Sequence, residues 1–356
     1  MGLRAYVARR LVYAVILIVA AMSLNFAIFL LMPGEVATVF IQQRGLSPQL
    51  ANQLIAEFNH NWGLDQPPLT RYAIYLKNMF TFNFGISMSG NRQPVAGMIL
   101  ERIPWTLLLI GSATVISILL GIATGVASAY KRGTLFDSGN LVTSLMLGTV
   151  PVFWLGLVLV VIFTQTLGWF PASLGVPPEW ARLGSPPVAF SFGSSMASSS
   201  GSILATVSTS SSLEFFVGIL SHAFLPVLTL TLFLYGGYTL LARATMIDAL
   251  TEDYIVTARA KGVSETSVLF RHALKNASLP IITSVALAFG FLFSGATITE
   301  TVFSYPGLGY WIFNAVQLKD FFSMQAIFYI ITLMVIIANI LADFLYGIVD
   351  PRIKYG

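Results

Sequence analysis

The side chains best suited to chemistry in this chain lie in one polar insert, residues 251–283, between two long apolar segments. Its first cations, Arg259 and Lys261, alternate with small residues. These small residues are Ala258, Ala260 and Gly262. Small side chains let another surface approach a helix backbone closely, and the two cations can contact a partner or lipid headgroups. The pattern therefore predicts a docking element.

Local signals predict that the insert forms two short helices joined by a tight turn. Thr251 can cap the first helix, whose first turn is acidic, as the helix dipole favours. Gly262 suits the left-handed residue that ends such a helix. Ser264 can cap the second helix, which would place Arg271 and Lys275 on one face. Another face would be apolar: Val268, Leu269 and Ala273.

The motif T-A-R-A-K-G at 257–262, followed by Leu279-Pro280, resembles the cytoplasmic coupling loop of ABC importer permeases. The resemblance continues in E-T-V-F-S-Y-P-G-L-G at 300–309 and in D-P-R-I-K-Y-G at the C-terminus, and it covers most of the chain except about 172–220. Together these motifs are similar to the dipeptide and oligopeptide class. The resemblance implies that ATPase subunits dock on these residues: Tyr254, Thr257, Ala258, Arg259, Ala260, Lys261, Gly262 and Glu265.

A second polar set lies near the expected outer end of the fifth apolar segment. Its members are three hydroxyl residues and one acid: Ser294, Thr297, Thr299 and Glu300. Such a set could line a translocation path for a neutral or cationic polar solute. An acid at a membrane interface in a turn explains Glu300 equally well, so both interpretations stay open.

Sequence motifs typical of enzyme active sites are missing from this chain. ATP hydrolysis needs a glycine-rich phosphate loop ending in Gly-Lys, and no Gly-Lys dipeptide occurs. The histidines His60, His222 and His272 are expected on both sides of the membrane, so no metal site is predicted. Asp343 is the one acid inside an expected span, which is too few for an aspartyl pair or a proton relay and favours a structural pairing. We expect no enzyme and no cofactor on this chain, with ATP and Mg bound by partner ATPases as the resemblance implies.

The composition indicates a membrane protein. Of 356 residues, 56% are hydrophobic and 10% are charged, and several apolar runs approach the length that spans a bilayer. The net charge of +4 could suggest nucleic-acid binding, but the basic residues cluster in short loops, as the positive-inside rule predicts. Because cysteine is absent, disulfides and thiolate metal sites cannot form. The apolar run after Arg9-Arg10 is too long for a signal-peptide core and is interpreted as a retained span.

These observations predict an all-α polytopic membrane protein with six transmembrane helices and both termini in the cytoplasm. The expected spans are about 11–31, 105–130, 138–167, 222–241, 279–299 and 324–347. A small extracytoplasmic domain would lie between helices 1 and 2, and the coupling helix between helices 4 and 5. The expected regions are 1–32, 33–103, the core 104–350 with an external loop 168–221 and a coupling loop 243–278, and a tail 351–356.

Three further features bear on the spans. Gly121-x-x-x-Gly125 offers a close contact between helices. Pro151 is expected to kink the third span. The serine-rich tract 191–212 lies in the external loop, departs from the resembled family, and is assigned no chemistry.

Three functions are compatible with a polytopic membrane protein. The resemblance implies a translocation subunit of an ATP-driven importer in the cell membrane, with a second homologous permease, two cytoplasmic ATP-binding subunits and an extracytoplasmic binding protein. Di- or oligopeptides are the expected cargo, with oligosaccharides or metal chelates as alternatives. A secondary transporter or channel would need inverted repeats, broken helices or ionisable relays. A membrane-embedded enzyme would need a constellation of reactive groups that the sequence lacks.

Overall fold

The computed structural model describes residues 3–31, 65–87, 93–171, 209–291 and 296–349, with isolated positions between 49 and 63. Within this part the regular secondary structure is helical, and the helices are joined by turns and by segments that include one isolated antiparallel bridge between Ile86 and Pro94. The predicted all-α class is therefore confirmed for the described residues. The chain divides into two compact units, one of residues 1–103, 289–295 and 311–356, the other of residues 104–288 and 296–310.

Four helices in the described part are long and apolar enough to cross a membrane: Arg9–Phe29, Val95–Tyr130, Val217–Leu250 and Phe321–Ile340. A fifth candidate is the pair Leu135–Thr149 and Val152–Thr166. The chain is therefore polytopic. The fifth expected span overlaps α12 (Leu274–Phe291) and would run on into 292–295, which lie outside the described residues.

The third expected span differs from the prediction of a single kinked helix. α6 (Leu135–Thr149) and α7 (Val152–Val160), the latter extended by the π-helical turn η1 (Val161–Thr166), are bent by 102° at their junction. Val150 is extended, as residues before proline prefer, and Pro151 starts α7 without an N–H to continue the earlier hydrogen-bond ladder. The proline thus breaks the helix instead of kinking it.

Helix boundaries also differ from the sequence estimates. α5 begins at Val95 and ends at Tyr130, so it starts well before the expected residue 105 and contains Pro104. α9 runs from Thr209 to Leu250 and passes Arg243, the basic residue at which the sequence predicts the end of the span. Charged side chains mark where a helix can leave an apolar environment, but they do not stop the helix itself.

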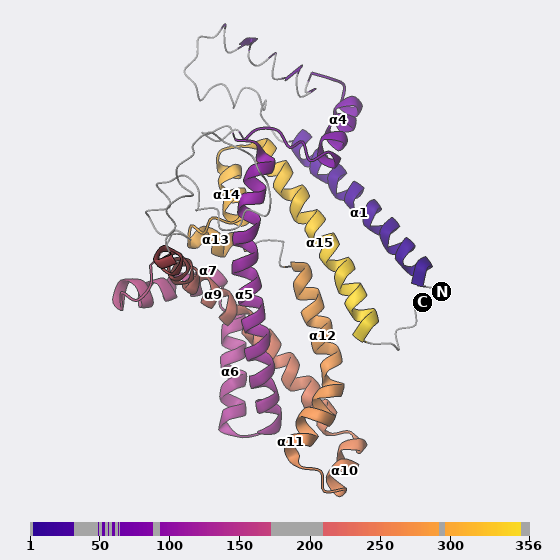
Figure 1. The fold of residues 1–356 in the computed structure, drawn as a ribbon, viewed down its shortest axis with the longest axis vertical. Coiled ribbons are helices and arrows are strands. Elements are labelled where there is room, and N and C mark those ends of the chain that lie inside the picture. Colours follow the sequence, from indigo (N-terminus) through magenta and orange to yellow (C-terminus); the bar gives the residue numbers. More distant parts are fainter. Residues whose placement is uncertain are drawn as a thin grey trace. The chain divides into compact units, whose positions relative to one another are not determined.

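The first unit contains α1 (Leu3–Leu31) beside α15 (Phe321–Val349) (Figure 1). The ring of Phe29 lies edge-on to Phe321, with centroids 6.3 Å apart. Asn25 is a polar residue in an apolar helix, and its Nδ2 donates hydrogen bonds to the Gln325 carbonyl at 3.1 Å and to Tyr75 Oη at 3.0 Å. Because buried amides need partners, these bonds make Asn25 compatible with its site.

The same unit contains α4 (Pro68–Phe80), the longest described helix of the expected extracytoplasmic domain. Tyr72 and Tyr75 of this helix pack on Phe26 of α1, with ring centroids 5.2 and 5.4 Å apart. Further along, the buried Asp320 carboxylate accepts hydrogen bonds from Ser87 Oγ at 2.5 Å and from Ser323 Oγ at 2.7 Å. These contacts fix the segment after α4 to the start of α15.

The second unit is organised by the contact of α5 and α6 with α9. A Cβ atom on Gly125 would lie 2.7 Å from the Thr239 carbonyl oxygen, closer than van der Waals contact allows. A Cβ on Gly121 would lie 2.5 Å from Tyr238 Cβ. Both glycines therefore let the backbones of α5 and α9 approach closely, which confirms the predicted role of this glycine pair.

Candidate functional site

The polar insert forms two short helical segments around a turn, as the sequence predicts. α10 (Asp253–Ala260) is followed by Gly262, whose φ of +76° is the left-handed conformation that favours glycine. α11 (Glu265–Ser267) and the π-helical η2 (Val268–Ala273) then run directly into α12. The second segment is thus the first part of a long helix and not a separate one.

The predicted caps are only partly correct. Thr251 does not cap α10, because its hydroxyl donates to the Asp248 carbonyl at 2.8 Å at the end of α9. Glu252 takes the N-cap position without a side-chain bond. Ser264 does occupy the N-cap position before Glu265, although it also makes no side-chain cap bond.

One apolar cluster holds the insert on the helices around it. Its buried members come from α5 (Val126, Ala129), α9 (Met246, Ala249), α10 (Ile255, Ala258), η2 (Val268, Leu269, Ala273) and α12 (Ala277). The predicted apolar face of the second segment is therefore confirmed. The ring of Tyr254 is half-buried against this cluster. Because all these elements share one core, a force on the insert acts on the ends of α5 and α9 as well.

We define the exposed face as residues 253, 256, 257 and 260 of α10, which follow the spacing of one helix face, together with Phe270 of η2. Val256 is 61% exposed and Phe270 is 59% exposed. Ala258 differs from the expectation of an open docking residue, since it is only 7% exposed. It packs inward with the apolar cluster, so the other small residue, Ala260, is the one that the helix presents outward.

Arg259 and Glu265 form a two-pronged ion pair across the turn. Arg259 Nε lies 2.9 Å from Glu265 Oε1, and Arg259 Nη2 lies 3.2 Å from Glu265 Oε2. Both side chains are nearly half exposed, so the pair contributes little stability but orients the turn. Lys261 is exposed on the same turn. Of the two predicted docking cations, Arg259 is thus engaged within the insert itself.

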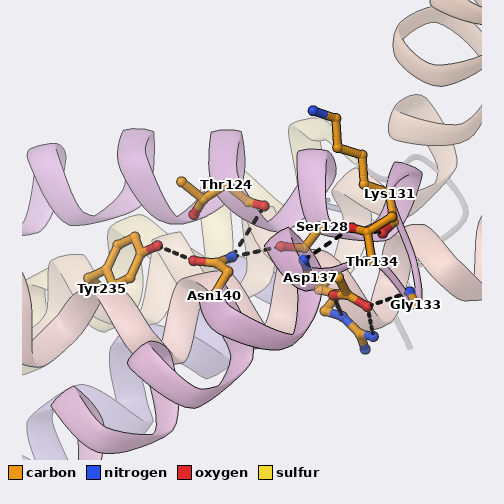
Figure 2. Close-up of polar contacts among 9 residues, drawn as sticks. Thr124, Ser128, Lys131, Gly133, Thr134, Asp137, Asn140 and Tyr235 are labelled. Atoms are coloured by element: carbon orange, nitrogen blue, oxygen red, sulfur yellow. Dashed lines mark hydrogen bonds and ion pairs between the residues drawn. The ribbon is translucent and has the colours of Figure 1, made fainter.

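A buried ion pair joins the start of α6 to α9. Asp137 Oδ1 accepts a hydrogen bond from Arg243 Nε at 2.6 Å, and Asp137 Oδ2 accepts from Arg243 Nη2 at 2.8 Å. The Asp137 side chain is 3% exposed and that of Arg243 is 20% exposed. Asp137 Oδ2 also accepts from the Gly133 amide at 3.0 Å, so the carboxylate closes the turn between α5 and α6 (Figure 2).

Asn140 continues the polar contacts one turn further along α6, toward α5 and α9 (Figure 2). Its Nδ2 donates to Ser128 Oγ at 2.7 Å, and its Oδ1 accepts from Tyr235 Oη at 2.6 Å. We call Asp137, Asn140, Ser128, Tyr235 and Arg243 the α6 polar link. Sequence reasoning missed it, because Asp137 was placed just outside the third span and its partner is far away in the chain.

The predicted path residues are largely enclosed. Glu300, in α13 (Thr297–Val302), is 0% exposed, and Thr299 is 2% exposed. Glu300 accepts hydrogen bonds from Thr106 Oγ1 at 3.0 Å and from the Tyr310 amide at 2.9 Å. Thr297 is partly exposed, and Ser294 lies outside the described residues. Burial raises the pKa of Glu300, although the hydrogen bonds from Tyr310 and Thr106 act in the opposite direction.

Glycines explain why the chain can fold over this carboxylate. A Cβ on Gly307 would collide with Glu300 Oε2 and Thr106 Oγ1, and a Cβ on Gly309 would lie 2.7 Å from Thr297 Cα. Thr106 Oγ1 also accepts a hydrogen bond from the Leu308 amide at 2.8 Å. Within the second unit, the motif at 300–309 is therefore a turn fastened to α5 by one acid and one hydroxyl.

Replacing Thr106 by valine is expected to lower the free energy of unfolding by about 1–3 kcal/mol. Valine keeps the shape but removes the donor to Glu300 and leaves the buried Leu308 amide without its acceptor. The thermal midpoint of the purified protein in detergent measures this loss. The control is Thr332→Val, whose hydroxyl bonds only the Phe328 carbonyl in its own helix. Equal midpoints for the two variants would contradict the proposed fastening.

Comparison with known proteins shows the family of the chain. Residues 117–355 match the family described as binding-protein-dependent transport system inner membrane component, and residues 3–110 match the N-terminal family of such membrane components. The chain is 34% identical to the di/tripeptide transport system permease protein DppB of Pseudomonas aeruginosa, over 98% of both chains. It is 33% identical to the dipeptide transport system permease protein DppB of Escherichia coli over 98% of both chains, and 32% identical to the oligopeptide transport system permease protein AppB of Bacillus subtilis over 99% of both.

Both the family match and the near full-length relatives cover the insert, the α6 polar link and the turn at 300–309. Matches at this identity over whole chains carry the fold and the general role of a family. The chain therefore belongs to the inner membrane permease components of binding-protein-dependent ABC importers.

Proposed function

We propose that this chain forms part of the translocation path of an ATP-driven importer and receives its energy from an ATPase that docks on the exposed face of the insert. One observation carries the proposal. The outward face of α10 is open, with Val256 61% exposed, while its inner face shares a core with α5, α9 and α12. An insert built in this way can bind a partner and pass a displacement to the membrane helices.

The proposed topology has six spans, with both termini in the cytoplasm. Support for this number comes from four long apolar helices, from the bent pair if it counts as one span, and from α12, which overlaps the remaining expected span. Contact between Asp137 and Arg243 supports a shared side for the α5–α6 turn and the end of α9. The basic residues Lys131 and Arg132 in that turn favour the cytoplasmic side.

The proposed assembly contains a second homologous permease, two cytoplasmic ATP-binding subunits and an extracytoplasmic substrate-binding protein. ATP and Mg would be held by the ATPase subunits, since this chain has no Gly-Lys dipeptide for a phosphate loop. The family description, which names binding-protein-dependent transport, supports the binding protein as a partner.

Di- or oligopeptides are the proposed cargo. The relatives named above are described as permeases for dipeptides, di/tripeptides or oligopeptides, which favours peptides over oligosaccharides or metal chelates. Because Glu300 is enclosed, we assign contact with cargo to the partly exposed Thr297, with Ser294 as a second candidate, and not to the acid. An oligosaccharide remains the alternative, because hydroxyl groups suit a sugar equally well.

Reconstitution with the cognate ATPases, second permease and binding protein in proteoliposomes tests the proposal. Peptide and binding protein together are expected to stimulate ATP hydrolysis and to drive peptide uptake. Uptake that proceeds without the ATPases would indicate a secondary transporter or channel. A panel of oligosaccharides and metal chelates, run in parallel, identifies the cargo, and stimulation by a sugar but by no peptide would reject the peptide assignment.

A further inference from the structure

The insert and α6 are connected through α9 and α5, by polar bonds and not by the apolar cluster. The apolar cluster that holds the insert has members from α5, α9, α10, η2 and α12, and none of its buried members that the structure describes comes from α6. α6 nevertheless packs along α9. Its firm attachments near the insert are polar: the Asp137–Arg243 ion pair and the bonds of Asn140 to Ser128 and Tyr235.

The position of Arg243 connects the two regions. This residue lies in α9, which continues without a break to Leu250 and reaches α10 at Asp253. Met246 and Ala249 of the same helical stretch belong to the apolar cluster under the insert. A displacement of the insert is therefore expected to move the backbone that carries the Arg243 guanidinium, since the insert packs on Met246 and Ala249 in the same stretch of α9.

The position of Asp137 connects the ion pair to the α5–α6 turn and to α6. It sits in the first turn of α6, and its carboxylate also holds the Gly133 amide in the α5–α6 turn. At its other end α6 meets the 102° bend into α7. The pair thus joins the helix that carries the insert to the helix that leads into the bend.

We propose that the Asp137–Arg243 ion pair makes α6 follow the docking insert, so that both side chains are positioning residues for the coupling of ATP hydrolysis to transport. The proposal rests on the proposed importer function. Arg243 donates two hydrogen bonds to the Asp137 carboxylate, whose side chain is 3% exposed. Two such bonds fix both the distance and the orientation of the guanidinium relative to the carboxylate. The ion pair holds the register of α6 on α9 at the start of α6, and the bond from Tyr235 to Asn140 holds it one turn further along.

The test uses the complete reconstituted complex with Asp137→Asn and Arg243→Gln as separate variants. Each variant is expected to insert, to copurify with the ATPases and to keep hydrolysis in the absence of binding protein and peptide. The number of peptides imported per ATP hydrolysed should fall on the order of tenfold, because the start of α6 loses its bond to α9 and follows the insert less closely. The ratio, and not the amount of complex, is the deciding measurement.

A conservative variant of Arg243 and a charge-removing variant elsewhere in the chain serve as controls. Arg243→Lys keeps the positive charge but cannot donate the two parallel hydrogen bonds of the guanidinium. Its number of peptides imported per ATP is therefore expected to lie between that of Arg243→Gln and that of the wild type. Glu101→Gln removes an exposed carboxylate 3.9 Å from Arg102, far along the chain from the α6 polar link, and should leave the ratio unchanged. This control separates a general effect of lost charge from the loss of the buried pair.

Two outcomes would overturn the proposal. In the first, Asp137→Asn and Arg243→Gln import as many peptides per ATP as the wild type. In the second, both variants lose the ATPases or fail to accumulate, which would leave the pair with a structural role only. A wild-type complex that neither binds ATPases nor responds to peptide would instead reject the proposed importer function, so the two failures are distinguishable.

Discussion

Replacing Ala260 with tryptophan is expected to reduce transport to background while the chain still inserts into the membrane. Ala260 is exposed and lies on the same face of α10 as Val256 and Thr257. Its small side chain leaves room for a docked surface, and core contacts between proteins are packed as densely as protein interiors. An indole there would hold the ATPase away and weaken docking by about tenfold or more, which corresponds to about 1.4 kcal/mol or more.

The measurement is the amount of ATPase that copurifies with the variant, together with peptide uptake in proteoliposomes. Ala244→Trp makes the same change at an exposed alanine of α9 outside the insert and should retain both. Ala258→Trp is not a suitable alternative, because Ala258 is 7% exposed within the apolar cluster and the indole would disrupt the core. Normal docking and uptake by Ala260→Trp would mean that the ATPase binds elsewhere, for example near Arg271 and Lys275.

Replacing Gly236 with alanine is expected to destabilise the chain by about 1–3 kcal/mol, the usual cost of forcing extra atoms into a packed contact. A Cβ at this position of α9 would collide with the carbonyl oxygen of Ser144 in α6. The obstacle is backbone and cannot rotate away, so α6 and α9 must separate. Separation would also stretch the nearby bond from Tyr235 to Asn140.

The neighbouring residue provides the control. A Cβ on Gly237 would meet no heavy atom within 4 Å, so Gly237→Ala should leave stability unchanged or raise it by up to about 1 kcal/mol, since alanine favours the helix. Thermal midpoints of the two purified variants in detergent give the comparison. Equal shifts in the same direction would show that the contact between α6 and α9 does not depend on the missing side chain.

The sequence by itself determined the features that depend on local patterns. Apolar runs and the distribution of charge identified a polytopic helical membrane protein, because a segment buried in lipid must satisfy its own backbone hydrogen bonds. Gly262 marked the turn of the insert through its left-handed conformation. Gly121 and Gly125 marked a close helix contact, since small residues at this spacing share one helix face.

Only the tertiary structure decided which side chains meet across long separations in the chain. Helical periodicity did not reveal that Ala258 faces inward, because inward and outward faces depend on what packs nearby. From the sequence, Glu300 could line a path, but in the structure it is buried and accepts hydrogen bonds from Thr106 and Tyr310. Asp137 and Arg243 are separated by 106 positions in the sequence, and the packing of α6 along α9 brings them together. Sequence patterns report local preferences, whereas these contacts depend on how whole helices pack.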